Sequence, residues 1–89
     1  MRLIDLKPEW EKDNTYLTFT CPTCPWDETK SRFGNCLIMI PTKVTEHETK
    51  PWQWNGETDF NKVTLTPSIW HHCSSDPHFF ITAGEVVFA

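Results

Sequence analysis

The sequence predicts an all-β or β-dominated domain of five to six short strands, held together by one zinc knuckle-type site. Short runs rich in β-branched and aromatic residues alternate with turn residues, and no apolar pattern is long enough for a convincing helix. A chain of 89 residues buries little apolar surface, so some additional constraint on the fold is expected. No repeat, low-complexity tract or linker interrupts the chain. We therefore expect residues 1–89 to form a single zinc-stapled β domain.

Three segments in the first half of the chain carry structural signals. Arg2–Trp10 fits either a short strand or one helical turn, with Pro8 opposing the helix. Tyr16–Thr20 alternates two faces, which predicts a half-buried strand. Cys36–Ile40 is an apolar run stopped by a proline, and its five residues are too few for a free-standing helix. We interpret this run as a central strand.

The second half of the chain carries four further strand patterns. They cover Trp52–Trp54, Val63–Thr66, Phe79–Thr82 and Glu85–Phe88. An Asn-Gly dipeptide follows the first of them and an Ala-Gly dipeptide joins the last two, which predicts tight turns at both places. Pro67 is expected to mark a sheet edge or the end of pairing, because proline has no amide hydrogen for a sheet ladder.

The charge balance excludes two classes of partner. The net charge is −4, and no Lys or Arg follows Lys62, which argues against nucleic acid because phosphate binding depends on basic groups. No run is long and apolar enough to cross a bilayer, and the N-terminal residues lack the pattern of a signal peptide. We therefore expect a cytoplasmic protein that binds neither nucleic acid nor membranes.

The cysteines and histidines predict a metal site. Cys21 and Cys24 form a C-x2-C pair at the end of a predicted strand, a spacing that directs both sulfurs toward one ion. Cys73 and His78 are the best second half, because a C-x4-H loop also brings two donors together. Three thiolates and one imidazole are a common structural zinc set. Zinc bound by these four residues is the expected cofactor.

Other ligands and other uses of the thiols remain open from spacing alone. His71 or His72 could replace His78, and Cys36 could serve as a further ligand, although its apolar neighbours favour a packed thiol. A redox dithiol is less favoured because no amphipathic helix follows Cys24. An iron–sulfur centre would need all four thiolates.

Several phrases of the sequence, read in order, resemble one known family. The phrases are FTCPTC, a Trp-rich stretch, TLTPSIW, and a Cys followed by HFFITAGEVVF. Together they resemble small phage and prophage proteins of a domain-of-unknown-function family, often labelled "putative ammonia monooxygenase". The resemblance implies that Cys21, Cys24, Cys73 and His78 match the family's metal ligands and that the chain is phage-encoded. The oxygenase label itself implies membrane-embedded copper chemistry, for which this chain is too small and too polar.

Two functional classes follow from these observations. The first is a non-enzymatic accessory protein that binds and modulates a host protein, such as a defence protein, through an exposed surface of Trp52, Trp54 and Trp70. The second is a small zinc-dependent hydrolase or deaminase, which would need an open metal position and a general base. A triad of Ser74, Asp76 and His78 is excluded because three residues so close in sequence cannot converge. We expect the accessory protein rather than the enzyme.

Overall fold

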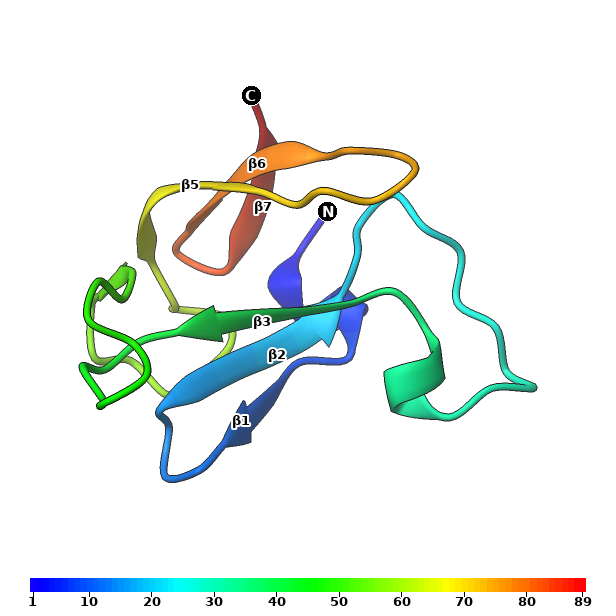
Figure 1. Ribbon diagram of the computed structural model, residues 1–89. Helices are drawn as coiled ribbons and strands as arrows, with labels where there is room; N and C mark the ends of the chain where they lie inside the picture. The colour runs from blue at the N-terminus through cyan, green and yellow to red at the C-terminus, as the bar shows by residue number, and fades with distance from the viewer.

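The computed structural model describes residues 1–89 and contains seven short strands and two 3-10 turns, without an α-helix. The strands form two antiparallel sheets, one in the order β1-β2-β3 and one in the order β4-β5-β6-β7. Figure 1 shows the strands β5 to β7 as one layer above the layer of β1 to β3. The prediction of a β-dominated fold is confirmed. None of the helical segments is long and apolar enough to span a membrane.

The first layer comes from the N-terminal half of the chain. Its elements are η1 (Leu3–Leu6), β1 (Glu9–Glu11), β2 (Tyr16–Thr20), η2 (Arg32–Gly34) and β3 (Leu37–Pro41). The strand β2 is paired on both sides, so it is the central strand of this sheet and β3 is an edge strand. The prediction of a central strand at Cys36–Ile40 is therefore wrong in its position. A five-residue apolar run is equally compatible with an edge strand whose inner face is buried.

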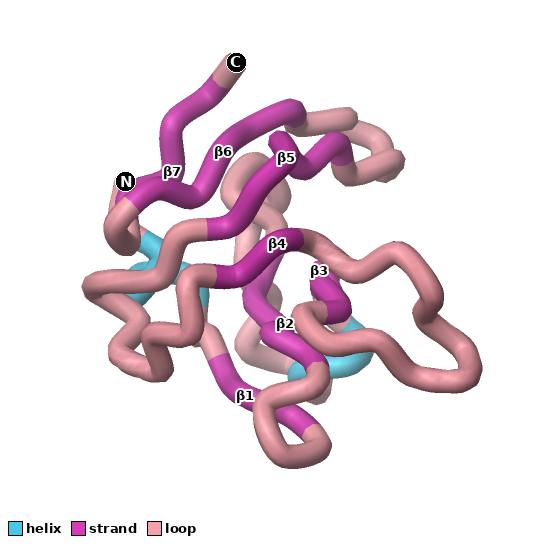
Figure 2. The backbone as a smooth tube through the Cα atoms, turned by 90° about the vertical axis from the view of Figure 1, so that its left-hand side faces the viewer, coloured by secondary structure: helices cyan, strands magenta, loops and turns pink.

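The second layer comes from the C-terminal half. Its strands are β4 (Gln53–Trp54), β5 (Leu65–Trp70), β6 (His78–Thr82) and β7 (Glu85–Phe88), and Figure 2 shows β4 beside β5. The hairpin between β6 and β7 turns at Ala83 and Gly84, whose φ angles are 47° and 77°. Two positive φ angles are what a tight two-residue hairpin turn requires. The predicted hairpin is confirmed.

The strand β5 contains an irregularity that matters for the site. Leu65 pairs with Ile81 and Ile69 pairs with Phe79, so three residues of β5 lie opposite a single residue of β6. Such a bulge re-aims side chains and leaves some amides out of the ladder. Pro67 lies inside this bulge, where its missing amide hydrogen costs no pairing, and the strand continues to Trp70. Pairing of β5 with β4 ends at Thr66, and pairing with β6 resumes at Ile69, so Pro67 lies at a local sheet edge, which is one of the two predicted alternatives.

The core lies between the two layers. It comprises thirteen buried apolar residues from both sheets and from η1. Phe19 of β2 meets Phe79 of β6 edge-on, with ring centroids 6.1 Å apart. On β6, Phe79 and Ile81 are fully buried, while His78 and Phe80 are exposed on the opposite face. The alternation of the strand thus presents an apolar inner face and an outer face that carries an imidazole.

Candidate metal centre and candidate active site

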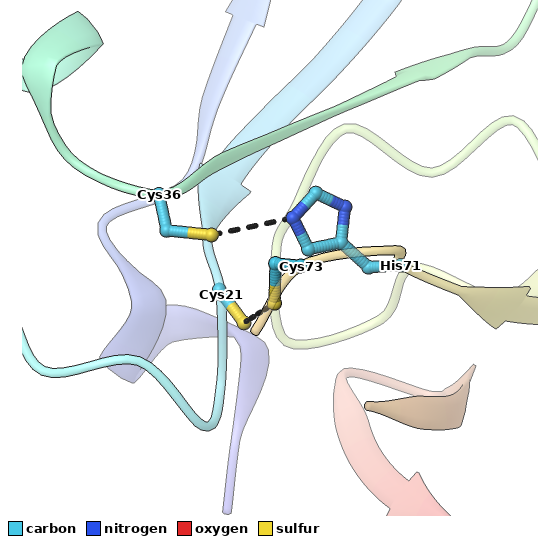
Figure 3. Close-up of side chains that lie close together, drawn as sticks. All are labelled: Cys21, Cys36, His71 and Cys73. Carbon is cyan, nitrogen blue, oxygen red and sulfur yellow. Dashed lines mark hydrogen bonds between the residues drawn. The ribbon is translucent and has the colours of Figure 1, made fainter. Parts of the chain in front are cut away.

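Cysteine and histidine side chains from three separate segments meet at one end of the molecule. Cys21 follows β2, Cys36 precedes β3, and His71 and Cys73 lie in the loop between β5 and β6. Figure 3 shows these four side chains directed toward one another. One donor atom from each lies within 4.8 Å of the others. The group can hold a metal ion, as the sequence predicts for this region.

The fourth thiol also reaches this group. Cys24 Sγ lies 3.8 Å from Cys73 Sγ, and Cys21 Sγ lies 3.9 Å from the same sulfur. A tetrahedral zinc ion with Zn–S bonds of ~2.3 Å separates its sulfur ligands by about 3.8 Å. The spacing of these thiols therefore fits the edge length of a tetrahedral site. Four cysteines and His71 offer five donors for four positions.

The loop between β5 and β6 is tied to this thiol cluster by hydrogen bonds. Ser75 Oγ lies 3.2 Å from Cys73 Sγ and 3.4 Å from Cys24 Sγ, and 2.6 Å from Thr23 Oγ1. At the base of the loop, the His71 amide donates to the Pro77 carbonyl. The loop is therefore closed at its base and attached at its tip to the C-x2-C segment. Its two ends lead directly into β5 and β6.

The thiols of the cluster differ in acidity. The side chain and amide of Ser75 and the amide of Asp76 lower the pKa of Cys73 to about 6. Burial, and then the neighbouring thiols, raise the pKa of Cys36 to about 12. Burial also lowers the pKa of His71, which keeps its imidazole neutral and able to donate a lone pair. Several thiols that share one small site repel one another when they ionise, and a bound cation offsets this repulsion.

His78 does not join the cluster, and here the structure differs from the predicted ligand set. It opens β6 on the exposed face of the sheet, whereas the cluster draws on the loop before it. His78 Nε2 instead lies 2.8 Å from Ser68 Oγ, within hydrogen-bond distance. His72 is also outside the cluster and faces Asp76 Oδ1 at 3.3 Å. Of the tandem histidines, only His71 approaches the sulfurs.

The register of the sheet explains why Ser68 meets His78. His78 pairs with Trp70 across the two strands, and Ser68 lies two residues before Trp70 on the same face of β5. The two side chains are therefore diagonal neighbours, and the bulge of β5 adjusts their approach. Ser68 is half-buried while His78 is exposed, so the pair is accessible from solvent. A serine hydroxyl beside an imidazole is the nucleophile and base of a serine hydrolase.

The three tryptophans of the predicted binding surface lie in different environments. Trp70 is 57% exposed and stacks on His78, with ring centroids 5.8 Å apart. Trp52 and Trp54 are half-buried against the core, and the Trp52 indole donates to the Ser68 carbonyl at 3.4 Å. Trp54 packs against Trp10 with centroids 5.0 Å apart. The three rings therefore do not form one exposed surface.

The chain is thus a small two-sheet β domain with a Ser68–His78 pair on one sheet and a thiol-rich cluster that could hold a metal ion. A family model described as "Bacterial ubiquitination-like system serine protease (BubE)" matches residues 6–89. Because the match covers nearly the whole chain, this protein belongs to the BubE family. No curated protein and no solved structure gives a significant match to the chain.

Family membership corrects several predictions made from the sequence. The resemblance to the "putative ammonia monooxygenase" family is wrong, because the matching family is BubE. The expectation of a non-enzymatic phage accessory protein is also wrong, since the family is described as one of proteases; the enzyme alternative fits better. The cysteines and tryptophans carry the clear signals in the sequence, and from them His78 was assigned to the metal. Ser68 was missed, although it lies in the phrase TLTPSIW, because a serine ten residues from a histidine carries no spacing signal of its own.

Proposed function

We propose that this protein is a serine protease in which Ser68 is the nucleophile and His78 the general base. The observation that supports this most directly is the distance of 2.8 Å between Ser68 Oγ and His78 Nε2. The family description, a serine protease of a bacterial ubiquitination-like system, agrees with that chemistry. It also makes a peptide or isopeptide bond of a protein handled by such a system the proposed substrate.

The proposed mechanism follows from the roles of the two side chains. The neutral imidazole of His78 accepts the proton of Ser68 as Oγ attacks the substrate carbonyl, and a C–O bond forms. The tetrahedral intermediate then collapses, the C–N bond breaks, and His78 returns the proton to the leaving amine. Water then attacks the acyl-Ser68 ester and gives a proton to His78. The bond between the carbonyl carbon and Ser68 Oγ breaks, His78 returns the proton to Oγ, and the acid is released. Each half of the cycle uses His78 once as base and once as acid.

Two tryptophans contact the proposed pair, one at each of its members. The Trp52 indole donates to the backbone carbonyl of Ser68, which fixes the nucleophile's strand where it bulges. The Trp70 ring lies nearly parallel to the His78 ring, with an interplanar angle of 26°. Stacking restricts the rotation of the imidazole, so less freedom is lost when the reacting geometry forms. In this proposal Trp52 holds the strand of Ser68, and Trp70 holds the ring of His78.

The test is covalent labelling with a fluorophosphonate probe, which reacts with activated serines. Wild-type protein should be labelled at Ser68, as identified by peptide mass analysis, and Ser68→Ala should abolish labelling. Ser74→Ala is the matched control, because Ser74 is exposed and lies in the neighbouring loop. If wild-type protein with an intact fold resists the probe, or if Ser68→Ala is labelled as strongly as wild type, the proposal fails.

We also propose that the thiol cluster binds zinc in a structural role. Thiolate ligands with tetrahedral spacing favour zinc, and a site closed by four protein ligands leaves no position for substrate. The proposed ligands are Cys21, Cys24, Cys36 and Cys73, and His71 Nε2 lies 3.3 Å from Cys36 Sγ, where in this ligand set its N–H would donate to the thiolate. A hydrogen bond of this kind orients a ligand and tunes its basicity. The ion would join the first sheet to the loop that precedes His78.

Metal analysis of single variants separates this ligand set from the alternative with three cysteines and His71. Cys24→Ser should reduce zinc to well below one ion per chain, whereas His71→Ala should retain it. The reverse result would place His71 in the ligand set and leave Cys24 outside it. Purified wild-type protein without a stoichiometric metal would contradict both sets.

A further inference from the structure

The outer face of the second sheet carries large apolar side chains that the core does not use. Trp70 and Phe80 are 57% and 41% exposed, although residues of the opposite face complete the core. Both rings stack on His78, with centroid distances of 5.8 Å for Trp70 and 6.4 Å for Phe80. The interplanar angles are 26° and 25°, so the imidazole is roughly parallel to each of the two rings. We call Trp70 and Phe80 the aromatic shelf.

We propose that the aromatic shelf is the side-chain subsite of the enzyme and that it selects an apolar residue at the acyl side of the scissile bond. This inference rests on the proposed function. The side chain in question is attached to the carbon next to the carbonyl that Ser68 attacks. It must therefore lie close to Ser68 Oγ, whose partner His78 stacks with both rings of the shelf.

The chemistry of the surrounding surface favours an uncharged apolar occupant. No Lys or Arg occurs in residues 63–89, from which β5, β6 and β7 are built, so these strands offer no cation to pair with an acidic side chain. Val87 lies opposite Phe80 on β7 and is 49% exposed, which extends the apolar surface away from His78. A side chain laid on this surface removes apolar area from water on both partners, and the gain grows with its size.

The position of the shelf also explains why it would act on specificity rather than on stability. Trp70 is cross-strand partner to His78, and Ser68 shares its strand face, so the ring lies at the reacting groups and not between the sheets. Exposed side chains contribute little to the free energy of unfolding. Trp70 is large, apolar and exposed, and it stacks on the proposed general base. It is therefore placed to contact substrate rather than to pack in the core.

The experiment compares two p-nitrophenyl esters, of N-acetylphenylalanine and N-acetylalanine, with the full-length protein loaded with zinc. Rates are taken above those of Ser68→Ala, which removes the intrinsic hydrolysis of the esters. For wild type, kcat/KM should be at least about five-fold higher for the phenylalanine ester. Trp70→Ala should reduce this ratio toward one, and Trp70→Phe should restore much of it. Melting temperature and zinc content should stay unchanged in both variants.

The ratio separates recognition from catalytic damage, because any loss of His78 positioning in Trp70→Ala lowers both rates together. Phe33→Ala is the control, since Phe33 is 71% exposed and lies on η2 in the other layer. If Trp70→Ala keeps the wild-type ratio, or if wild type shows no preference for the larger ester, the subsite proposal is overturned while Ser68 labelling still supports the protease. If Ser68 is not labelled, the proposed function itself fails.

Discussion

The thiol cluster and the Ser68–His78 pair are built in opposite ways. The cluster takes donors from three chain segments, two in the first layer and one in the loop between β5 and β6. The pair takes both members from adjacent strands of one sheet. A site assembled from distant segments constrains the whole fold, whereas a pair on neighbouring strands depends on the sheet but contributes little to holding it together. The two centres should therefore respond differently to substitution.

The largest effect is expected from removal of the proposed metal ligand Cys21, which is 2% exposed and belongs to both proposed ligand sets. Zinc binding at such a site contributes about 10 kcal/mol or more of apparent free energy, and that energy is coupled to folding. Cys21→Ser should therefore lose zinc and unfold near room temperature. A strong chelator or acid, which protonates the thiolates, should do the same to wild type. Calorimetry and metal analysis measure this together; an unchanged melting temperature after the ion is removed would contradict a stapling role.

Substitution of His78, the proposed general base, should lower the reaction rate without changing the stability of the fold. His78→Ala should lower Ser68 labelling and ester hydrolysis by at least about 10³-fold, because the nucleophile loses its proton acceptor. Zinc content and melting temperature should match wild type, since His78 lies outside the cluster. His47→Ala provides a matched control, because His47 is exposed and faces Glu46 rather than a reacting group. A loss of zinc in His78→Ala would instead return His78 to the ligand set.

The difference between a cluster built from distant segments and a pair on neighbouring strands also explains what could be predicted from the sequence. Cysteine is rare and its C-x2-C spacing is informative, so the region of the metal site was predictable from Cys21, Cys24 and Cys73. The choice between His71 and His78 was not, because it depends on which residues lie in the loop and which enter β6. Strand alternation and the Ala-Gly turn likewise predicted the β6–β7 hairpin.

The proposed catalytic pair could not be read from the sequence for a related reason. Ser68 and His78 meet because Trp70 pairs with His78 directly after the irregular stretch of β5 between Leu65 and Ile69. Sequence patterns indicate which residues form strands but not how a bulge shifts their pairing. Pro67, interpreted from sequence as a sheet edge or the end of pairing, lies within that bulge, where pairing with β4 has ended. It therefore lies beside the proposed nucleophile.

The two faces of β6 allow the next comparison. Phe79 is fully buried and touches both Phe19 and Phe88, whereas Phe80 is 41% exposed. Phe79→Ala should lower the free energy of unfolding by about 3–5 kcal/mol, because it removes a large ring and leaves a cavity. Phe80→Ala should cost below about 1 kcal/mol, as is usual for an exposed side chain. Denaturant unfolding of both zinc-loaded variants gives the comparison; equal losses would mean that Phe80 is a packing residue and not part of a surface shelf.

The smallest effect tests how the nucleophile is held. Trp52→Phe removes the indole that donates to the Ser68 carbonyl and retains an aromatic ring against the core. One such hydrogen bond contributes about 0.5–1.5 kcal/mol, so the rate of Ser68 labelling should fall by about two- to ten-fold. Trp54→Phe is the matched control, because its indole donates to the Glu57 carbonyl at 3.0 Å, away from Ser68. Both variants lose one indole hydrogen bond and similar ring volume, so their melting temperatures should shift alike. A slower labelling rate in Trp52→Phe alone would show that the bond positions Ser68, whereas equal rates in the two variants would leave it a purely structural contact.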